Sequence, residues 1–354
     1  MVHRKIWIKI LLAAFLLSPS LLVKAENSEE AEKFNPGTFI LDHIGDSYGW
    51  HILTFNGHHV TVPLPVIVYS KQSGFHAFMS SKFHHGDDYK GFLIASEGEY
   101  KGKIVELAAD GSFVRPTVDL SITKNVFALF VSMAIILWVF ISVAKAYKRR
   151  SLSAPSGLQS WVEPVILFIR DDVARPAIGH KYERYMPYLL TIFFFILVNN
   201  LMGLIPFFPF GANVTGNIAV TMVLALLTFF ITSFTADKNY WVHIVNTPGV
   251  PWWLKFPLPL MPFIEIVGMF TKPLVLMIRL FANIAAGHII AIGFFSLIFI
   301  FGALNPVMGY GVSVISVVFT VFMTFLELLV AFIQAYVFTL LSALYFGMAV
   351  EEHH

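Results

Sequence analysis

The chain has 354 residues, of which 57% are hydrophobic and only 13% are charged, and its mean hydropathy is +0.72. A composition this apolar excludes an ordinary water-soluble globular protein and predicts an integral membrane protein. The formal net charge of +2 forms no basic stripe, so we expect no nucleic-acid partner. Because the chain has no cysteine, disulfides, thiol nucleophiles and cysteine-ligated metal clusters are excluded.

Residues 1–25 have the features of a cleavable signal peptide. Basic residues between His3 and Lys9 precede the apolar run Ile10–Val23, and Val23-Lys24-Ala25 offers small or apolar side chains at the recognition positions. A short first membrane helix is the competing interpretation. The run is interrupted by Ser18-Pro19-Ser20 and is shorter than the roughly 20 apolar residues that a span requires. We therefore expect the following residues to be exported.

Residues 26–121 form a different compositional zone, with turn signals and alternating segments such as His59–Val68 and Gly91–Ser96. This pattern predicts a small, mostly β, exported domain. A cluster of imidazoles can bind a metal, but no repeated spacing or carboxylate pattern accompanies these histidines, so we interpret them as turn and surface residues and expect no metal site. The zone holds seven of the thirteen histidines, namely His43, His51, His58, His59, His76, His84 and His85.

Residues 122–354 begin with three predicted membrane crossings. The first, Asn125–Ala144, is followed by four basic residues, which mark the cytoplasmic side. The mixed segment 151–184 is expected to lie on the inner membrane surface. Two further spans, Tyr185–Pro206 and Val214–Ala236, form a hairpin with an uncharged turn, and the aromatic loop 237–255 lies in the cytoplasm.

The last two apolar segments are too long for upright crossings. Phe256–Phe301 has 46 residues, roughly 69 Å as a helix against a hydrocarbon core of about 30 Å. Two crossings with a hidden turn and one tilted helix are the alternatives, and the lack of a turn dipeptide favours the tilted helix. Gly311–Val350 repeats the pattern, so we expect a hairpin about Asn305-Pro306 on the outside. The predicted fold is an all-α polytopic membrane domain of about five transmembrane helices after a mostly β domain.

Four charged side chains lie inside the predicted helices of this apolar half, namely Glu265, Lys272, Arg279 and Glu327. An unpaired charge in a bilayer costs several kcal/mol, so each is expected to face protein or water and to mark an ion pathway. Snorkelling or a structural ion pair is the alternative, and it is strongest for Lys272. For Arg279, which has apolar neighbours on both sides, it is weakest.

The spacing of these residues predicts two half-paths. Glu265, Lys272 and Arg279 are seven apart and share a seam with Asn283, while Glu327 and Gln334 share a face of the last helix. If the helices are antiparallel with Gln334 level with Arg279, Glu327 and His288 lie about 10 and 13 Å toward the outside. An imidazole and a carboxylate at matching depth can pass a proton. Glu265 lies about 21 Å from Arg279 on the cytoplasmic side.

Three motifs in this region resemble the signature of subunit a of the F-type bacterial ATP synthase. They are Thr271-Lys272-Pro273, Arg279-Leu280-Phe281-Ala282-Asn283 and Ala286-Gly287. The resemblance covers about residues 180–354 and includes Asn199–Pro206 and Asn213-Val214-Thr215. It implies a proton-translocating stator subunit in the bacterial inner membrane, which offers two aqueous half-channels to a ring of c subunits and couples proton flow to rotation and ATP synthesis.

The resemblance also implies a role for each candidate residue. Arg279 matches the essential arginine, which attracts the ring carboxylate and prevents protons from leaking between the half-channels. His288 and Glu327 match a pair that lines the outer half-channel, in the opposite order in some members. The remaining matches are Gln334 with the glutamine beside the arginine, Asn283 with a polar residue one turn on, and Glu265 with a carboxylate of the cytoplasmic half-channel.

The implied partners are the c-ring, the b subunits of the peripheral stalk and the lipid bilayer, with no cofactor, metal or nucleotide on this chain and no catalysis by the chain alone. The ion-binding carboxylate would belong to the ring, so sodium stays an alternative to the proton. The resemblance gives no role to residues 26–121, for which contact with the ring or stalk and a purely structural appendage are both open.

A proton-coupled secondary transporter, with Arg279 binding an anionic substrate, is the alternative function. Transporters often have repeated halves, and no repeat relates residues 122–236 to 256–350. An intramembrane hydrolase is disfavoured because neither His-Glu-x-x-His nor Gly-x-Ser-x-Gly occurs.

Overall fold

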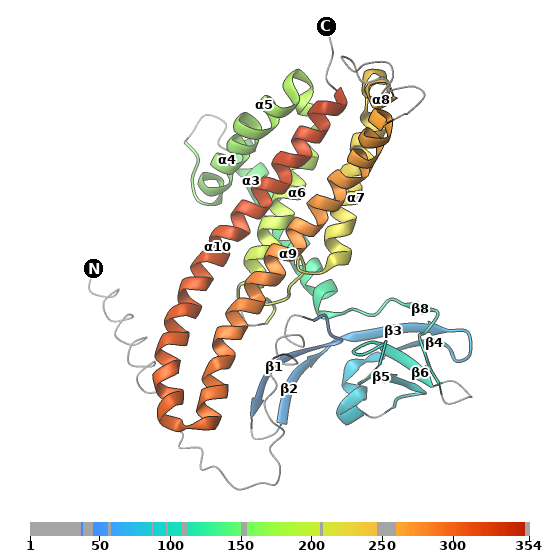
Figure 1. Ribbon diagram of the computed structural model, residues 1–354, viewed down its shortest axis with the longest axis vertical. Helices are drawn as coiled ribbons and strands as arrows, with labels where there is room; N and C mark the ends of the chain where they lie inside the picture. The colour runs from blue at the N-terminus through green and yellow to red at the C-terminus, as the bar shows by residue number, and fades with distance from the viewer. Residues whose placement is uncertain are drawn as a thin grey trace. The chain divides into compact units, whose positions relative to one another are not determined.

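The computed structural model describes residues 37, 45–55, 58–86, 88–96, 98–107, 112–149, 154–205, 208–245 and 260–350. The expected signal peptide, residues 1–25, and the terminal residues 351–354 lie outside the described residues. The described chain is β-rich before residue 120 and helical from residue 124 onward (Figure 1). This division agrees with the predicted fold class.

We call residues 45–121 the β domain. Its strands form three small antiparallel sheets, ordered β1-β2, β4-β3-β8 and β5-β6-β7. Its core is built from Tyr48, Val66, Val68, Phe92 and Ile104. The strands are β1 Gly49–Phe55, β2 His58–Pro63, β3 Pro65–Ser70, β4 Gly74–Met79, β5 Phe92–Ile94, β6 Ile104–Leu107, β7 Phe113–Val114 and β8 Val118–Asp119.

One alternating segment of the β domain was too long in the sequence prediction. His59–Val68 is divided at Leu64 into β2 and β3, which belong to different sheets. The interruption between β2 and β3 is stabilised because the Leu64 backbone N–H donates to Ser80 Oγ at 2.9 Å and not to a neighbouring strand. A short 3₁₀ helix, Ser80–Gly86, follows β4.

Five helical segments among the described residues are long and apolar enough to cross a membrane, in agreement with the predicted number. One of them, Leu158–Gly203, joins α4, a π-helical turn, α5 and α6 into a nearly continuous helical stretch. The helices are α3 Lys124–Arg149, α4 Leu158–Phe168, α5 Arg175–Ile178, α6 Tyr182–Gly203, α7 Ile218–Thr235, α8 Lys238–Val245, α9 Leu260–Leu304 and α10 Pro306–Val350.

Helices α9 and α10 each run for 45 residues without interruption and lie side by side as a hairpin (Figure 1). A helix of that length is about 68 Å long, more than twice a hydrocarbon core of about 30 Å. Because α9 is unbroken, the alternative of two crossings joined by a hidden turn is wrong. The α10 helix begins at Pro306 rather than Gly311 because Asn305 Oδ1 accepts the Val307 N–H at 2.9 Å and proline suits the first helical position.

The second and third spans also occur, but their connection is longer than the sequence suggested. The α6 helix ends at Gly203 and α7 begins at Ile218, not Val214. The later start has a local cause, because Asn217 caps α7 by accepting the Ala219 N–H at 3.0 Å. We call residues 208–217 the α6–α7 loop.

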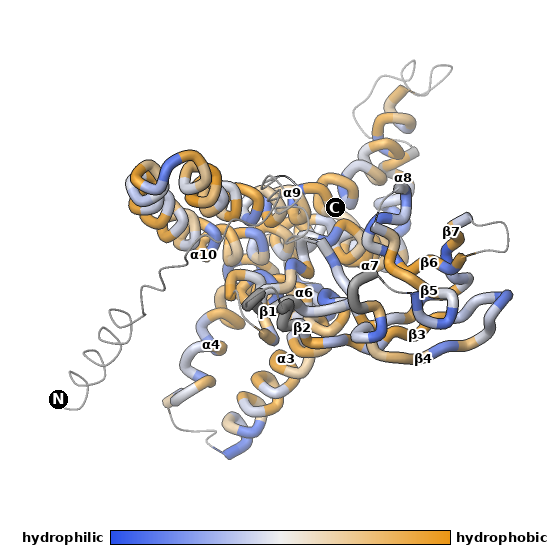
Figure 2. The backbone as a smooth tube through the Cα atoms, turned by 90° about the horizontal axis from the view of Figure 1, so that it is seen from below, coloured by the Kyte–Doolittle hydropathy of each residue, from blue (hydrophilic) through white to orange (hydrophobic). Residues whose placement is uncertain are grey.

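The main helical core lies where α6 meets α10 and the α4–α5 segment. Tyr185 of α6 stacks on Phe346 of α10, with ring centroids 4.7 Å apart. Ile169 and Val173, from the segment expected at the membrane surface, are fully buried in the same core. Helices α9 and α10 are apolar along most of their length (Figure 2). Toward their hairpin they expose side chains such as Leu304 and Val314.

Candidate functional site: a polar cavity between α6, α9 and α10

A cavity of about 200 Å³ lies between α6, the α6–α7 loop, α9 and α10. Apolar side chains form much of its wall, but each of the four elements also contributes polar side chains. These are Asn199 and Asn200 from α6, Asn213 and Thr215 from the loop, Asn283 and His288 from α9, and Glu327 from α10. A cavity of this size and polarity can hold several water molecules.

His288 and Glu327 reach this cavity from neighbouring helices at positions where the facing residues are glycines. A Cβ added to Gly287 would lie 3.0 Å from Glu327 Oε1, so the carboxylate rests on the bare backbone of α9. A Cβ added to Gly203 would lie 3.7 Å from His288 Nε2, so the imidazole approaches α6. The antiparallel hairpin therefore brings an imidazole and a carboxylate to one cavity.

Asn200 connects three walls of the cavity. Its Nδ2 donates to the Ala331 carbonyl of α10 at 3.2 Å, and its Oδ1 accepts the Thr215 hydroxyl of the α6–α7 loop at 2.5 Å. All three residues are buried. Buried hydrogen bonds of this kind fix the spacing of the elements because breaking one leaves a buried polar group without a partner.

Within the described part of the chain, three buried polar atoms of the cavity residues lack a protein hydrogen-bond partner. They are Asn199 Oδ1, Asn213 Nδ2 and Glu327 Oε1. Leaving a buried polar atom unsatisfied costs about 1–3 kcal/mol, which a bound water avoids. The cavity is thus chemically suited to a chain of water molecules that ends at a carboxylate and an imidazole.

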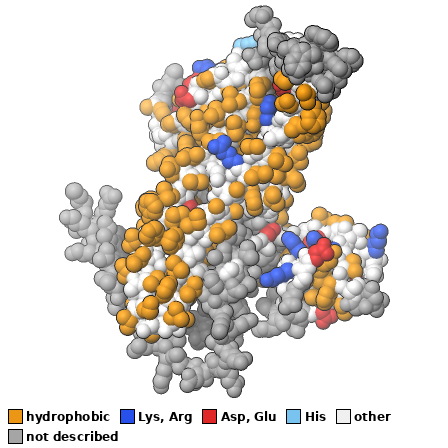
Figure 3. Space-filling model, viewed as in Figure 1, with side chains coloured by type: hydrophobic (Ala, Val, Ile, Leu, Met, Phe, Trp, Pro, Cys, Tyr) orange, Lys and Arg blue, Asp and Glu red, His pale blue; other side chains and the backbone are white. Residues whose placement is uncertain are grey.

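Arg279 is not part of the cavity wall. It is exposed on α9, as is Asn283 one turn further on, and its exposed neighbours include Val275 and Ile278. Figure 3 shows basic atoms surrounded by hydrophobic side chains midway along the face of α9 and α10. Among the described residues, no carboxylate lies within ion-pair distance of Arg279. A guanidinium on an apolar face needs an anionic partner.

Lys272 differs from Arg279 because α10 provides it with contacts. Its Nζ lies 3.9 Å from Met348 Sδ and 5.6 Å from the centre of the Tyr345 ring. Lys272 is partly buried. The contacts favour the structural interpretation of this lysine.

The cytoplasmic candidates lie elsewhere. Glu265 is partly buried and lines neither this cavity nor the much smaller one, of about 20 Å³, near Lys272. That second cavity is lined by polar groups that include Thr228, Thr232 and Tyr240. Burial and, to a smaller extent, the charge of Glu265 raise the pKa of Tyr240 in α8. The Glu265 carboxylate therefore lies close enough to Tyr240 for the two groups to interact electrostatically.

The structure therefore brings together three of the six predicted site residues, Asn283, His288 and Glu327. Gln334 is only 6% exposed and does not line the cavity. Asn199, Asn213 and Thr215 also line the cavity. The sequence analysis named them within motifs that carry the resemblance but did not predict them as site residues, because an uncharged polar residue within or beside an apolar span is a weaker signal than a charge.

Of the seven histidines in residues 26–121, His76 is the one whose side chain the structure describes. It is hydrogen-bonded through Nε2 to the Ser73 carbonyl at 2.8 Å. In the described part of the chain, no group of three or more His, Cys, Asp or Glu side chains is placed to hold a metal ion.

Comparison with known proteins divides the chain at the start of α3. Residues 126–347 match the family described as ATP synthase A chain. Residues 39–125 match a domain of unknown function, DUF8433.

Three relatives show how far the similarity extends. The ATP synthase subunit a of Chloroherpeton thalassium is 44% identical over 244 residues, which are 66% of this chain and 69% of the relative. The ATP synthase subunit a 2 of Chlorobaculum tepidum is 45% identical over 277 residues, covering 76% and 72%. The ATP synthase subunit a of Chlorobium phaeobacteroides (strain DSM 266) is 42% identical over 284 residues, covering 76% and 78%.

Proposed function

The chain belongs to the subunit a family of ATP synthases, and on this premise we propose that its polar cavity is the outer of two half-channels leading to a rotating c-ring. The chain is a multi-pass membrane protein with a proton-translocating role in the membrane sector, and it is not catalytic alone. The comparisons give no support to the alternative of a secondary transporter.

The observation that carries the proposal is the meeting of His288 and Glu327 at one cavity with unpartnered polar atoms. Water in the cavity delivers a proton to this pair, and the pair passes it toward the ring. Both groups can exchange protons, and each lies against a glycine of a neighbouring helix. Asn283 lines the same cavity and is exposed on α9 near Arg279, so it marks the end of the path that faces the ring.

Arg279 supplies the second element of the mechanism. A guanidinium stays protonated under all physiological conditions, so it attracts an ionised ring carboxylate without releasing a proton itself. Its exposure on an apolar face, with no carboxylate partner in the described chain, supports a partner on another subunit. The ring carboxylate would exchange its proton on either side of this barrier, and the cytoplasmic half-channel would run past Glu265. Gln334 would line the barrier on α10.

The proposed orientation is supported by charge. Lys145, Lys148 and Arg149 lie at the end of α3, and an excess of basic residues at one end of a span favours a cytoplasmic location for that end. The β domain is then outside the inner membrane and the end of α10 inside the cell. From family membership alone we also place the b subunits of the peripheral stalk beside this chain.

The experiment that tests the proposal is ATP-driven acidification of inverted membrane vesicles that carry Arg279→Ala, with subunit assembly measured in the same membranes. We expect acidification to fall to background while the complex stays assembled. Lys272→Ala is the matched control, because it removes a cation seven residues away whose contacts lie within the chain, and it should retain most of the activity. Unchanged acidification with Arg279→Ala would remove the proposed barrier.

A further inference from the structure

The β domain is joined to α3 by a network of hydrogen bonds and not by a free linker. Asp46 accepts the backbone N–H of Asn125 at 3.0 Å through Oδ1 and the Thr123 hydroxyl at 2.8 Å through Oδ2. The Lys124 N–H donates to the Ser47 carbonyl at 2.8 Å. Asp46 thereby caps the positive N-terminal end of α3, although it lies far away in sequence.

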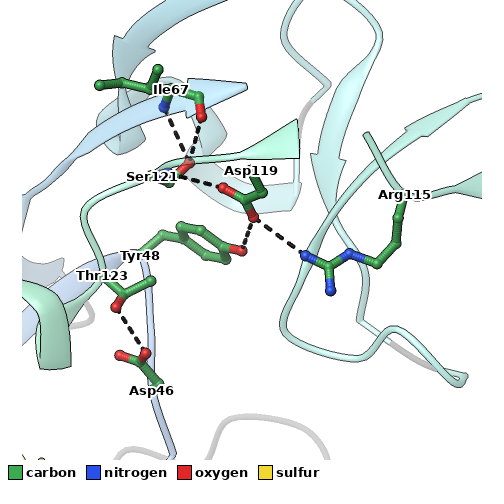
Figure 4. Close-up of polar contacts among 7 residues, drawn as sticks. All are labelled: Asp46, Tyr48, Ile67, Arg115, Asp119, Ser121 and Thr123. Atoms are coloured by element: carbon green, nitrogen blue, oxygen red, sulfur yellow. Dashed lines mark hydrogen bonds and ion pairs between the residues drawn. The ribbon is translucent and has the colours of Figure 1, made fainter. Parts of the chain in front are cut away.

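A second network holds the segment just before α3 on strand β3 (Figure 4). The Tyr48 hydroxyl donates to Asp119 Oδ2 at 2.7 Å, and Arg115 forms an ion pair with the same oxygen at 3.4 Å. The Ile67 N–H donates to Ser121 Oγ at 3.1 Å. The end of the β domain and the start of α3 are therefore fixed to each other.

Trp50 of β1 contacts both α3 and the α6–α7 loop, and so links the β domain to that loop. Its ring makes edge contacts with Phe127 of α3, at 6.0 Å between centroids, and with Phe208 of the loop, at 5.5 Å. It is 5% exposed and belongs to a buried cluster with Ala212 and Val214. Buried aromatic contacts of this size are among the strongest anchors in proteins.

The α6–α7 loop lies between the Trp50 cluster and the cavity. Val214 packs in the cluster, Asn213 and Thr215 line the cavity that holds His288 and Glu327, and Ala212 belongs to both. One face of the loop is thus held by the β domain while the other forms the cavity wall.

We propose that the β domain braces the α6–α7 loop through Trp50 and so sets the access of water to His288 and Glu327. Trp50 is a positioning residue in this proposal, since it touches the wall and not the proton path. The effect on proton entry rests on the proposed function of the cavity, whereas the brace itself does not. The β domain thereby gains a role in the membrane sector.

The test uses a single cysteine, Asn213→Cys, and reads the label on this subunit after the subunits are separated, because the parent chain has no cysteine of its own. The rate of labelling by a small charged methanethiosulfonate is measured in the assembled ATP synthase, in vesicles with the β domain side outward. With Trp50→Ala, we expect labelling at least about tenfold faster, which corresponds to about 1.4 kcal/mol of lost loop stability. Trp50→Phe, which keeps an aromatic anchor, should restore most of the slow rate.

Two controls separate the brace from general damage. Phe75→Ala changes an aromatic side chain of the same domain that is 67% exposed, and it should leave the rate unchanged. Val214→Ala removes the contact from the loop side while the β domain stays intact, so it carries the test if Trp50→Ala prevents folding. If Trp50→Ala and Val214→Ala each increase the labelling rate, the double variant should increase it by less than the product of the two single increases, because the two residues belong to the same contact.

The outcomes distinguish the brace from the channel. Equal labelling rates in the parent, Trp50→Ala and Val214→Ala chains would overturn the brace, whatever the path of the proton. Faster labelling with slower ATP-driven acidification would support both the brace and the half-channel. Faster labelling with unchanged acidification would support the brace and count against the assignment of this cavity to proton entry.

Discussion

Glu327 of α10 rests on Gly287 of α9, where a Cβ would stand 3.0 Å from the Oε1 atom of the carboxylate. The close approach explains why a glycine occupies the middle of a long helix, where it otherwise lowers helix stability by about 1 kcal/mol relative to alanine. The glycine leaves room for a carboxylate that must face a cavity between two tightly paired helices.

Gly287→Ala is therefore expected to impair proton transport although alanine favours the helix. The added methyl group forces the Glu327 carboxylate aside, and overpacking of this kind costs about 1–3 kcal/mol. Because about 1.4 kcal/mol is a tenfold change, we expect the initial rate of ATP-driven acidification to fall by about tenfold.

Gly293→Ala is the matched control for this change. Gly293 lies on the same helix, and nothing lies within 4 Å of a Cβ added there. It should be as active as the parent chain. If Gly287→Ala and Gly293→Ala pumped protons equally well, the position of the Glu327 carboxylate would be irrelevant to transport.

The His288 and Glu327 pair predicts a second result, because both residues reach one cavity from opposite helices. Exchanging them, as His288→Glu with Glu327→His, keeps one imidazole and one carboxylate at the cavity. The double variant should retain more acidification activity than either single variant, since each single variant leaves two groups of one kind. Initial rates in vesicles with equal amounts of assembled complex provide the measurement. Single variants as active as the parent would contradict the pair.

The membrane helices could be predicted from the sequence because their signals are local. Apolar runs and basic flanks located the spans, and the motif Asn305-Pro306 located the hairpin of α9 and α10. The boundaries were less accurate because caps decide them. Asn305 and Asn217 each cap a helix through a side chain, so the observed starts of α10 and α7 differ from the predicted starts by several residues.

The site could be predicted only in part. A charge inside an apolar helix identified Glu327 as a candidate, and helical spacing placed His288 at the depth of Glu327. The loop wall and Trp50 could not be predicted, because the contact between residue 50 and residues 208–214 depends on tertiary packing. No local pattern encodes a contact over so long a separation.

The hydrogen bond between Tyr48 and Asp119 gives a prediction with a defined pH range. Burial, together with this bond, raises the pKa of Tyr48 well above its ordinary value of 10.0. The folded state has the higher pKa, so the stabilisation is complete below about pH 10 and is lost as the pH rises through the folded pKa. Between pH 6 and 8 the contribution should therefore be constant.

Tyr48→Phe should remove this contribution, which is about 1.5–3 kcal/mol for a hydrogen bond to a charged group. Amide protons in β3 and β8 should exchange roughly ten- to a hundredfold faster than in the parent complex, since exchange reports local stability. The ratio of the two rates should be the same at pH 6 and pH 8. A ratio of one at both values would mean that the bond does not stabilise the β domain.

Gly347 predicts how the end of α10 is held. A Cβ at this position would collide with the carbonyl oxygen of Ala177 in α5, a backbone atom that cannot move aside as a side chain can. Gly347→Ala must therefore separate α10 from α5, at a cost of about 1–3 kcal/mol. Gly268→Ala, on α9 with nothing within 4 Å of its added Cβ, is the control.

In detergent, the Gly347→Ala complex should lose its a subunit at a lower temperature than the control complex. Equal temperatures for the two would show that the α4–α5 segment can shift freely against α10, contrary to the packing of Ile169 and Val173 in the main core.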